Sequence, residues 1–523
     1  MLVSVKNQDF PHAKFVLTPK LAGCGRMEIF MKKLLCFGLV MFLITISCST
    51  AYAGARPSRS DSYLYQNGVD VSAPAAYNYE KSISLVDNSG KSVANPQDMF
   101  LSEDGLLYIL DTDNGRILIY NSELSLVDVL DTFTTADGKR EALKKPEGLF
   151  VTADNKIYIA DTENNRILET DTEGNVLNIF GKPEGLIITS TETYLPIRIV
   201  VDSAGRMSVV ARNINMGIIQ MTPEGKFVGY TGTPKVKVDI FTKFWKSISS
   251  KKVKDKLSQF VPTEYSNMTI DKKGFIYGTI SSLSASDVLG EIQSKARDGQ
   301  TAAVKRINLM GDDILRRLGD YTPLGDLYFN ETPSKIIDVA LGSYEIYSLL
   351  DSTEGRIFTY DSFGNMLYIF GDIGNEKGNF VRPVSLLYMG QKVVVLDSVL
   401  NELIIFDITD YGLTVLNAVG TYYDGEYTKS YEYWSQVASE NSNFQYAFIG
   451  LGKSKVEQGL YAEAMKYFEY AKDKKDYSIA KEKLRKEQLK VNFPIAFYTL
   501  LTVCILSGLI KILRKFLKYY RGE

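Results

Sequence analysis

A motif that recurs every 50 residues constrains this 523-residue chain more than any other feature. Asp111 in the first copy corresponds to Asp161 in the second, and Arg116 corresponds to Arg166. Within each copy, apolar runs of four to six residues end at Gly, Asn or Asp, which is typical of short strands joined by tight turns. Six copies are visible, beginning at Asn95, Lys145, Pro196, Tyr265, Pro333 and Pro383.

Units of this kind cannot fold alone, because a single four-stranded sheet leaves both faces exposed. Stacking the sheets radially around an axis buries those faces, and this arrangement is a β-propeller. We therefore predict a mainly β fold with a six-bladed β-propeller over residues 79–420, preceded by a linker at 54–78. The strand-like segment 79–86 lies before the first unit and is expected to complete the last blade and close the ring.

The repeated motif also resembles a known family. Its elements are Pro-x-Gly/Asp-hydrophobic, Tyr-Ile-x-Asp-Thr, Asn-x-Arg-Ile and Asp-x-x-Gly-Asn, and in this order they are similar to NHL repeats. The first two copies match closely, the fifth and sixth fairly, and the third and fourth poorly. The resemblance covers residues 79–420 apart from two insertions, and it implies a six-bladed propeller.

The repeated aspartates and arginines allow two interpretations. They could form a carboxylate or cation site, but short polar side chains at strand ends more often satisfy the backbone of a turn. We expect the second role, with each arginine lying over the neighbouring blade. The residues concerned are Asp111, Asp161, Asp351, Arg116, Arg166 and Arg356.

Two insertions interrupt the repeat. The first, at 235–260, has eight lysines and two aspartates and spaces its apolar residues as an amphipathic helix does. Such a helix either docks on the propeller or contacts an anionic envelope polymer, lipid head groups or an acidic partner. The second insertion, at 282–319, is polar and helix-prone, and we predict a cap on one propeller face. The interaction candidates in the first insertion are Lys243, Trp245, Lys246, Lys251 and Lys252.

A helical module is predicted after the propeller. Gly425 and Gly459 lie 34 residues apart, as do Trp434 and Phe468, and 34 is the tetratricopeptide (TPR) period. The small and large residues over 424–480 resemble about one and a half repeats of that family, which implies a groove for peptides or a spacer; an ordinary helical hairpin is the alternative. Residues 481–492 are expected to form a solvated stalk.

The two ends of the chain indicate export and anchoring. Residues 31–53 have two lysines, an apolar stretch and Ala-Tyr-Ala before Gly54, as a signal peptide does, and residues 1–30 are expected to be a dispensable extension. Residues 493–512 are apolar enough for a transmembrane helix, and a buried core helix is the alternative. The tail at 513–523 is basic, so the positive-inside rule places it in the cytoplasm. We thus predict a single-pass, bacterial cell-membrane protein with its bulk outside.

The composition excludes several chemistries. His12 is the only histidine and precedes the signal peptide, so the mature protein would lack Ser-His-Asp and Cys-His centres and histidine-bound zinc. The net charge of -2 provides no overall field for nucleic acid. We identify no catalytic, metal or cofactor residue in the sequence, and we expect no cofactor.

Three hypotheses for function remain. The first is a non-catalytic, membrane-anchored scaffold that binds a protein or glycan outside the cell. The second is a calcium-dependent lactonase, because six-bladed propellers include enzymes resembling gluconolactonase and regucalcin, whose metal is held in the central channel by Glu, Asn and Asp. The third is a sensor, which would have to act through another membrane protein because the 13-residue tail at 511–523 cannot contain an enzyme.

Overall fold

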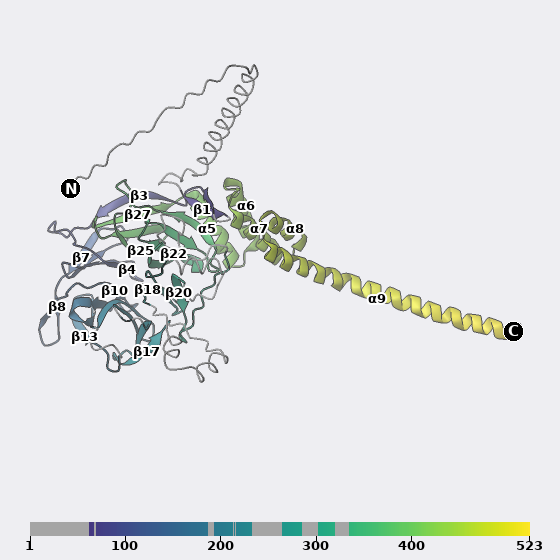
Figure 1. Ribbon diagram of the computed structural model, residues 1–523, viewed down its shortest axis with the longest axis horizontal. Coiled ribbons are helices and arrows are strands. Elements are labelled where there is room, and N and C mark those ends of the chain that lie inside the picture. The colour runs from purple at the N-terminus through teal and green to yellow at the C-terminus, as the bar shows by residue number, and fades with distance from the viewer. Residues whose placement is uncertain are drawn as a thin grey trace, which may run out of the picture. The chain divides into compact units, whose positions relative to one another are not determined.

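The computed structural model describes residues 62–66, 69–186, 193–212, 214, 216–232, 264–284, 302–319 and 334–522. Within these ranges the chain forms a series of antiparallel sheets followed by helices (Figure 1). The predicted signal peptide, the extension before it, the whole basic insertion and residues 285–301 of the second insertion lie outside the described residues.

Six sheets form the propeller, and in the first four the order of strands follows the chain outward from the axis. The innermost strands of successive sheets contact each other in a closed ring of six, which confirms the predicted fold. The first three blades are β4 (Asp98–Leu101), β5 (Leu107–Asp111), β6 (Arg116–Tyr120) and β7 (Leu126–Leu130); β10 (Gly148–Val151), β11 (Ile157–Asp161), β12 (Arg166–Thr170) and β13 (Val176–Phe180); and β14 (Leu195–Val201), β15 (Met207–Arg212), β16 (Ile218–Met221) and β17 (Phe227–Thr231).

The remaining blades depart from the four-strand pattern. The fourth has three strands among the described residues, the fifth has six, and the sixth takes one strand from the start of the propeller. They are β18 (Asn267–Ile270), β19 (Ile276–Thr279) and β20 (Val304–Ile307); β21 (Ile336–Leu341), β22 (Tyr347–Asp351), β23 (Ile357–Tyr360) and β24 (Met366–Phe370) with β1 (Tyr63–Gln66) and β2 (Val69–Ser72); and β25 (Pro383–Met389), β26 (Lys392–Asp397) and β27 (Glu402–Ile408) with β3 (Tyr77–Ser84). A separate short hairpin, β8 (Phe133–Thr134) and β9 (Arg140–Glu141), follows the first blade.

Burial along each blade explains its sequence. Every residue of β5, β11 and β22 is buried, because neighbouring blades cover both faces of a middle strand. These strands are therefore continuous apolar runs that end in Asp. The outermost strands β7 and β13 carry exposed residues at two and three of their five positions, since nothing in the described part of the chain covers their edge.

Ring closure occurs where the sequence predicts it. β3 pairs antiparallel with β27 from Tyr77↔Ile408 to Ser84↔Glu402. The sixth sheet thereby joins the beginning of the propeller to its end, so the ring is closed by backbone hydrogen bonds.

Three predicted boundaries were wrong. The linker 54–78 contains a hairpin, because β1 pairs with both β2 and β24 and extends the fifth blade. Residues 302–319 are not a helical cap: β20 pairs with β19, and a turn then leads to the Ile307↔Asp313 bridge. Val304 and Ile307 are buried within the fourth blade, which favours a strand over the helix that local propensity suggested. Finally, residues 410–420 belong to a helix and not to the propeller.

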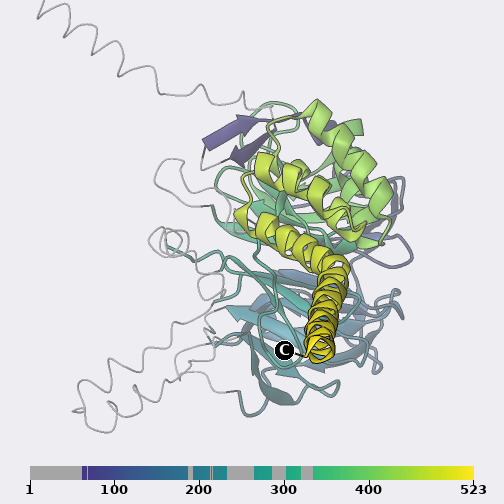
Figure 2. The same ribbon diagram turned by 90° about the vertical axis from the view of Figure 1, so that its right-hand side faces the viewer.

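Five helices follow β27: α5 (Asp410–Tyr423), α6 (Tyr427–Glu440), α7 (Gln445–Glu457), α8 (Tyr461–Tyr470) and α9 (Lys474–Arg521). Thr409 begins α5 by accepting a hydrogen bond from the Gly412 amide at 3.0 Å, as an N-cap does. Figure 2 shows α5 to α8 stacked beside one another, and successive helices contact each other. The predicted 34-residue spacing places Gly425 and Gly459 in equivalent turns, after α5 and after α7, with φ of +82° and +79°.

Small residues allow these helices to pack closely. A Cβ added to Gly450 would lie 2.5 Å from the Trp434 ring, and one added to Gly452 would lie 2.5 Å from the Phe468 ring. The two glycines thus let the rings of Trp434 and Phe468 lie directly against the backbone of α7. α5 to α7 also share one hydrophobic core with the fifth and sixth blades, so the helices are packed on the propeller.

α9 is a single helix of 48 residues that contains both the predicted stalk and the predicted span. Its apolar part has a mean hydropathy of 2.1 over 18 residues and packs against no other described part of the chain. α9 is thus a candidate membrane span by length and composition.

Candidate functional site

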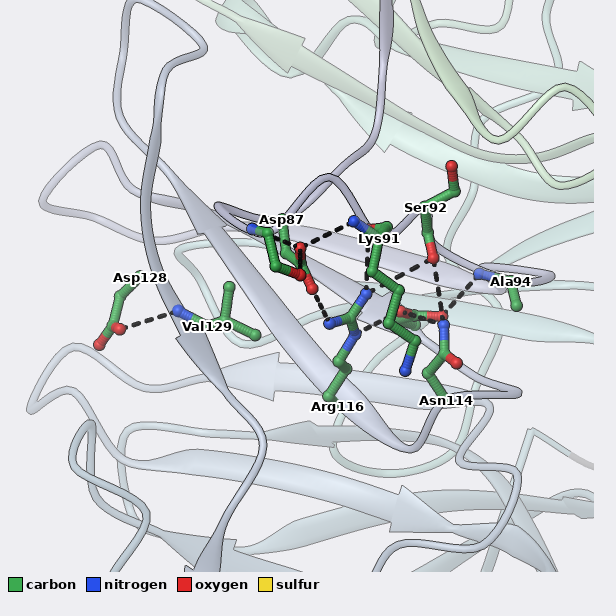
Figure 3. Close-up of polar contacts among 10 residues, drawn as sticks. Asp87, Lys91, Ser92, Ala94, Asn114, Arg116, Asp128 and Val129 are labelled. Atoms are coloured by element: carbon green, nitrogen blue, oxygen red, sulfur yellow. Dashed lines mark hydrogen bonds and ion pairs between the residues drawn. The ribbon is translucent and has the colours of Figure 1, made fainter.

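The repeated aspartates accept hydrogen bonds from backbone amides, as predicted, but the arginines bond the segment before their own blade or the blade itself, and not the neighbouring blade. In the fifth blade, Asp351 accepts from the Lys335 amide at 2.7 Å and Arg356 donates to the carbonyl of Gly371. In the first blade, Asp111 accepts hydrogen bonds from the Ala94 amide at 2.8 Å and from Arg116 Nε at 2.7 Å. Arg116 also pairs with Asp87, so one arginine joins the strand end to the loop before the blade (Figure 3). Figure 3 also shows Asn114 directed toward the same loop.

The second blade repeats this arrangement 50 residues later. Asp161 accepts hydrogen bonds from the Lys144 amide at 2.7 Å and from Arg166 Nε at 2.8 Å, and Arg166 pairs with Glu141. The threonine after each aspartate joins neighbouring blades, because Thr112 donates to the carbonyl of Pro146 and Thr162 to that of Pro196, both at 2.8 Å. The motif thus holds loops and blades together and leaves its carboxylates engaged.

A different set of residues meets at the propeller axis. Asp98 on β4 pairs with Leu110 on β5, the residue just before Asp111. The equivalent residues on the innermost strands of the other five blades, together with Asp98, form what we call the axial ring. Five of the six residues are polar, and three of those bear amide or carboxylate oxygens at burial above nine-tenths. The axial ring consists of Asp98, Gly148, Arg198, Asn267, Asp338 and Ser385.

Arg198 is the centre of a hydrogen-bond network in this ring. Its Nε donates to Asn267 Oδ1 at 2.9 Å, one terminal nitrogen donates to the carbonyls of Glu147 and Ile197, and the other donates to the carbonyl of Gln97 at 3.2 Å. A single side chain of the third blade therefore bonds the first, second and fourth blades.

The other ring residues extend the network to all six blades. Asp98 accepts from the Leu149 amide at 2.8 Å, which joins the first blade to the second. Asn267 Nδ2 donates to Asp338 at 2.8 Å, and Asp338 accepts from the Leu386 amide at 2.7 Å, which joins the fourth blade to the fifth and the fifth to the sixth.

Gly148 provides the room that Arg198 needs. A Cβ at this position would lie 2.5 Å from the Ile197 carbonyl oxygen and 2.9 Å from the Arg198 Cα. Both distances are too short for real contacts, so a side chain at 148 would displace the start of the third blade. Glycine at 148 is therefore what allows the backbone that carries Arg198 to lie so close to the second blade.

Burial governs the electrostatics of the ring. It raises the pKa of Asp338 to about 6, with a further contribution from the charge of Asp98. Burial likewise raises the pKa of Asp98, and in both cases the positive charge of Arg198 opposes the shift. The ring thus holds two buried acids beside one arginine.

The ring does not fit the divalent cation of the lactonase hypothesis. Calcium takes six to eight oxygen ligands and brings two positive charges, but Arg198 already donates to Asn267 Oδ1 and its charge already acts on both Asp98 and Asp338. Arg198 supplies the positive charge. Across the described ranges, no group of three or more His, Cys, Asp or Glu side chains is arranged to hold a metal.

A cleft of about 1260 Å³ lies between the fourth and fifth blades and the helices. The blades contribute Tyr277, Tyr347 and Phe363, and α5 and α6 contribute Tyr423 and Trp434. Tyr423 and Phe363 keep exposed surface that a partner can contact, whereas Tyr277, Tyr347 and Trp434 are buried. The cleft is therefore formed jointly by the propeller and the helical module.

A hydrogen-bond pair fixes the helices at the edge of this cleft. The hydroxyl of Tyr446 on α7 donates to Asp361 Oδ2 at 2.6 Å, and Asn365 Nδ2 donates to the same hydroxyl at 3.0 Å. Burial and the nearby charge of Asp361 raise the pKa of Tyr446 well above its ordinary value. Lys453, also on α7, lies over the rings of Phe363 and Tyr446 at 5.5 and 5.6 Å.

More of the acids than of the cations that line the cleft have a hydrogen-bond or ion-pair partner. Seven cations and five acids line it. Among the acids, Asp361 bonds Tyr446, Glu345 pairs with Lys273 and Arg306, Asp473 caps α9, and Asp476 lies 4.0 Å from Lys453. Within the part of the chain that the structure describes, five of the cations form no ion pair: Arg316, Lys472, Lys474, Lys475 and Lys483.

The sequence-predicted interaction residues of the basic insertion, from Lys243 to Lys252, lie outside the described residues, so the structure does not place them. The axial ring was not predicted, although the sequence contains one signal of it. Asp98, Gly148 and Arg198 are 50 residues apart, at the same step as the repeat, and a register comparison would have identified them. The cleft had no sequence signal, because its residues come from eight separate segments.

The comparisons with known proteins bear on the fold alone. No protein-family model and no curated protein matches the sequence. Virginiamycin B lyase from Staphylococcus aureus is 10% identical with a TM-score of 0.37, and the match covers 63% of this chain and 99% of that chain.

Two further solved structures match to a similar degree. A protein assigned as a gluconolactonase is 9% identical over 64% of this chain and 93% of that chain, with a TM-score of 0.37. A protein of unknown function from Bacteroides thetaiotaomicron is 10% identical over 68% of this chain and 84% of that chain, with a TM-score of 0.39. We draw no conclusion about activity from similarities of this size.

Proposed function

We propose that this chain is a membrane-anchored, non-catalytic binding protein that holds a protein or glycan partner outside the cell in the cleft between its propeller and its TPR-like helices. The observation that carries the proposal is the composition of the cleft. Aromatic side chains from both modules line it, four of its five acids are engaged internally, and five of its seven cations, Arg316, Lys474 and Lys475 among them, form no ion pair among the described residues. This imbalance favours an anionic partner.

Anchoring is supported by the last part of α9. Beyond the apolar segment, cations recur at intervals of three and four residues, which places them on one face of the helix. A basic stripe directly after a span is typical of the cytoplasmic end of a membrane helix and of contact with anionic lipid head groups. The stripe consists of Lys511, Arg514, Lys515, Lys518 and Arg521.

The lactonase alternative gains no support from the axis. A calcium-dependent hydrolase of this architecture needs a cation among the ring oxygens, and in this chain those oxygens bond backbone amides and Arg198. We therefore do not retain it as a second candidate.

Co-purification of the full chain from its native membranes, at low and high ionic strength, tests the proposal. The variant Lys474→Glu/Lys475→Glu reverses two charges of the cleft. It should fold, because acidic side chains in the first turn of a helix are favourable. We expect the variant to lose the partner, whereas Lys226→Glu, an exposed change on the third blade, should retain it. Equal recovery with both variants would contradict the proposal.

A further inference from the structure

We infer that the guanidinium of Arg198 is the resident cation of the propeller axis and occupies the place that a divalent ion would otherwise take among Asp98, Asn267 and Asp338. The inference does not depend on the proposed binding function, because it concerns how the six blades are held together at the axis. It predicts that the native protein needs no metal and that removal of this one charge creates a cation site.

The first argument is the chemistry of the three neighbours. Asp98, Asn267 and Asp338 offer carboxylate and amide oxygens, which are the ligand types that calcium prefers. Each is at least nine-tenths buried, with 7%, 3% and 6% of its surface exposed. Two buried carboxylates at one axis are costly to the fold unless a positive charge accompanies them.

The second argument is the number of bonds that Arg198 makes. All three of its nitrogens are used, and they reach Asn267 on the fourth blade and carbonyls on the first and second. Arginine suits this position because its planar fork of donors can serve several acceptors at once and stays charged at any physiological pH. A divalent ion would bridge blades in the same way through coordination.

The third argument is that the surrounding backbone is adapted to arginine. Gly148 faces the Ile197–Arg198 backbone so closely that a Cβ would lie 2.5 Å from a carbonyl oxygen. The second blade thus leaves its own ring position empty of side chain, and the Arg198 side chain bonds the adjoining Glu147 carbonyl. The backbone of the second blade is thus shaped to accommodate the guanidinium of Arg198.

Removal of the guanidinium leaves the oxygens in place. In Arg198→Met, the two carboxylates and the Asn267 oxygen lose their cation but keep their backbone hydrogen bonds. The variant would therefore present a negatively charged, oxygen-lined position at the axis, which calcium can enter.

Thermal unfolding of the full chain in detergent, with excess calcium or with a chelator, tests the inference. The melting temperature of the natural protein should be the same in both. Arg198→Met should melt about 5 to 10 °C lower in chelator, and calcium should restore at least half of that loss. Arg198→Met/Asp338→Asn should not respond to calcium, because one carboxylate is gone.

Matched variants make each outcome decisive. Arg206→Met removes an exposed arginine of the same blade, which pairs with Asp202, and should change neither the melting temperature nor the response to calcium. Arg198→Lys keeps a charge at the axis, so it should fold and ignore calcium even if Arg198→Met fails to fold. Luminescence of terbium, a calcium mimic, should be absent with the natural protein and present with Arg198→Met.

Two results would overturn the inference. One is a rise in melting temperature or terbium luminescence for the natural protein, which would mean that the axis takes a metal beside Arg198. The other is an Arg198→Met protein that is as stable as the natural one, or whose loss calcium does not restore.

Discussion

Arg198 Nε donates a hydrogen bond to Asn267 Oδ1 at 2.9 Å, across the boundary between the third and fourth blades. The relationship matters because Asn267 in turn donates to Asp338, so a chain of side chains crosses the axis from the third blade to the fifth. The propeller is therefore closed twice, by backbone pairing of β3 with β27 at its rim and by polar side chains at its centre.

Substitution of Gly148 by alanine should disturb this centre. The added Cβ would lie 2.5 Å from the Ile197 carbonyl oxygen, and backbone must move to accommodate it. We expect a loss of about 1–3 kcal/mol in the free energy of unfolding, as for other overpacked sites, measured by denaturant titration. Gly181→Ala is the control, because no atom lies within 4 Å of its added Cβ; an equal loss in both would contradict the packing argument.

The motif aspartate should be far more important for stability than an exposed one. Asp161→Ala removes the acceptor for the Lys144 amide and for Arg166, whose side chain is only 15% exposed. We expect a cost of about 3–5 kcal/mol, typical of breaking a buried pair. Asp154→Ala breaks a pair with Lys156 in which the two side chains are 64% and 43% exposed, and should cost less than about 1 kcal/mol. Calorimetry of both variants would show whether this order holds.

The pH dependence of stability should contain a contribution from Asp338. Burial raises its pKa in the folded protein to about 6, above the value of 3.8 that an exposed aspartate has. The folded state therefore binds this proton more tightly than the unfolded state. The resulting stabilisation is complete below about pH 4 and is lost as the pH rises through about 6, an effect of about 3 kcal/mol.

Asp338→Asn removes this titration, so the slope of unfolding free energy against pH should flatten between about pH 4 and pH 6. Asp137→Asn serves as the control, because a hydrogen bond from Thr135 lowers the pKa of Asp137 and its titration lies outside that window. A slope unchanged by Asp338→Asn would show that the carboxyl is not shifted as described.

The contact between Tyr446 and Asp361 should hold the helices on the propeller. Tyr446→Phe removes the hydroxyl that donates to Asp361 at 2.6 Å. We expect a loss of about 1–3 kcal/mol, because a hydrogen bond to a buried carboxylate is removed, and faster amide hydrogen exchange in α7. Tyr470→Phe changes a ring that is 64% exposed on α8 and should leave exchange unchanged.

Much of the fold was predictable because its determinants are local and periodic. The spacing of Asp111 and Asp161, and the apolar runs before them, reflect middle strands buried on both faces. The 34-residue interval between Gly425 and Gly459 likewise reflects two equivalent turns with positive φ. In both cases each repeat needs the same local conformation, so the sequence repeats as well.

The errors arose where tertiary contacts override local preference. Residues 302–319 have helix-forming composition, but Val304 and Ile307 are buried in the fourth blade and adopt a strand. The hairpin of β1 and β2 is joined to the fifth blade by the pairing of Tyr63 with Ile369, some 300 residues away. The cleft depends on contacts of the same range, which no periodicity indicates.

Site-specific photo-crosslinking tests the central claim, that the cleft binds an anionic partner, most directly. A benzophenone amino acid is placed at Tyr423, which lines the cleft and is 48% exposed, or at Val228, which is 66% exposed on the third blade. In native membranes we predict an adduct from position 423 alone, weakened by salt and abolished by Lys474→Glu/Lys475→Glu. Adducts of equal yield from both positions, or an adduct at 423 that survives charge reversal, would contradict the account.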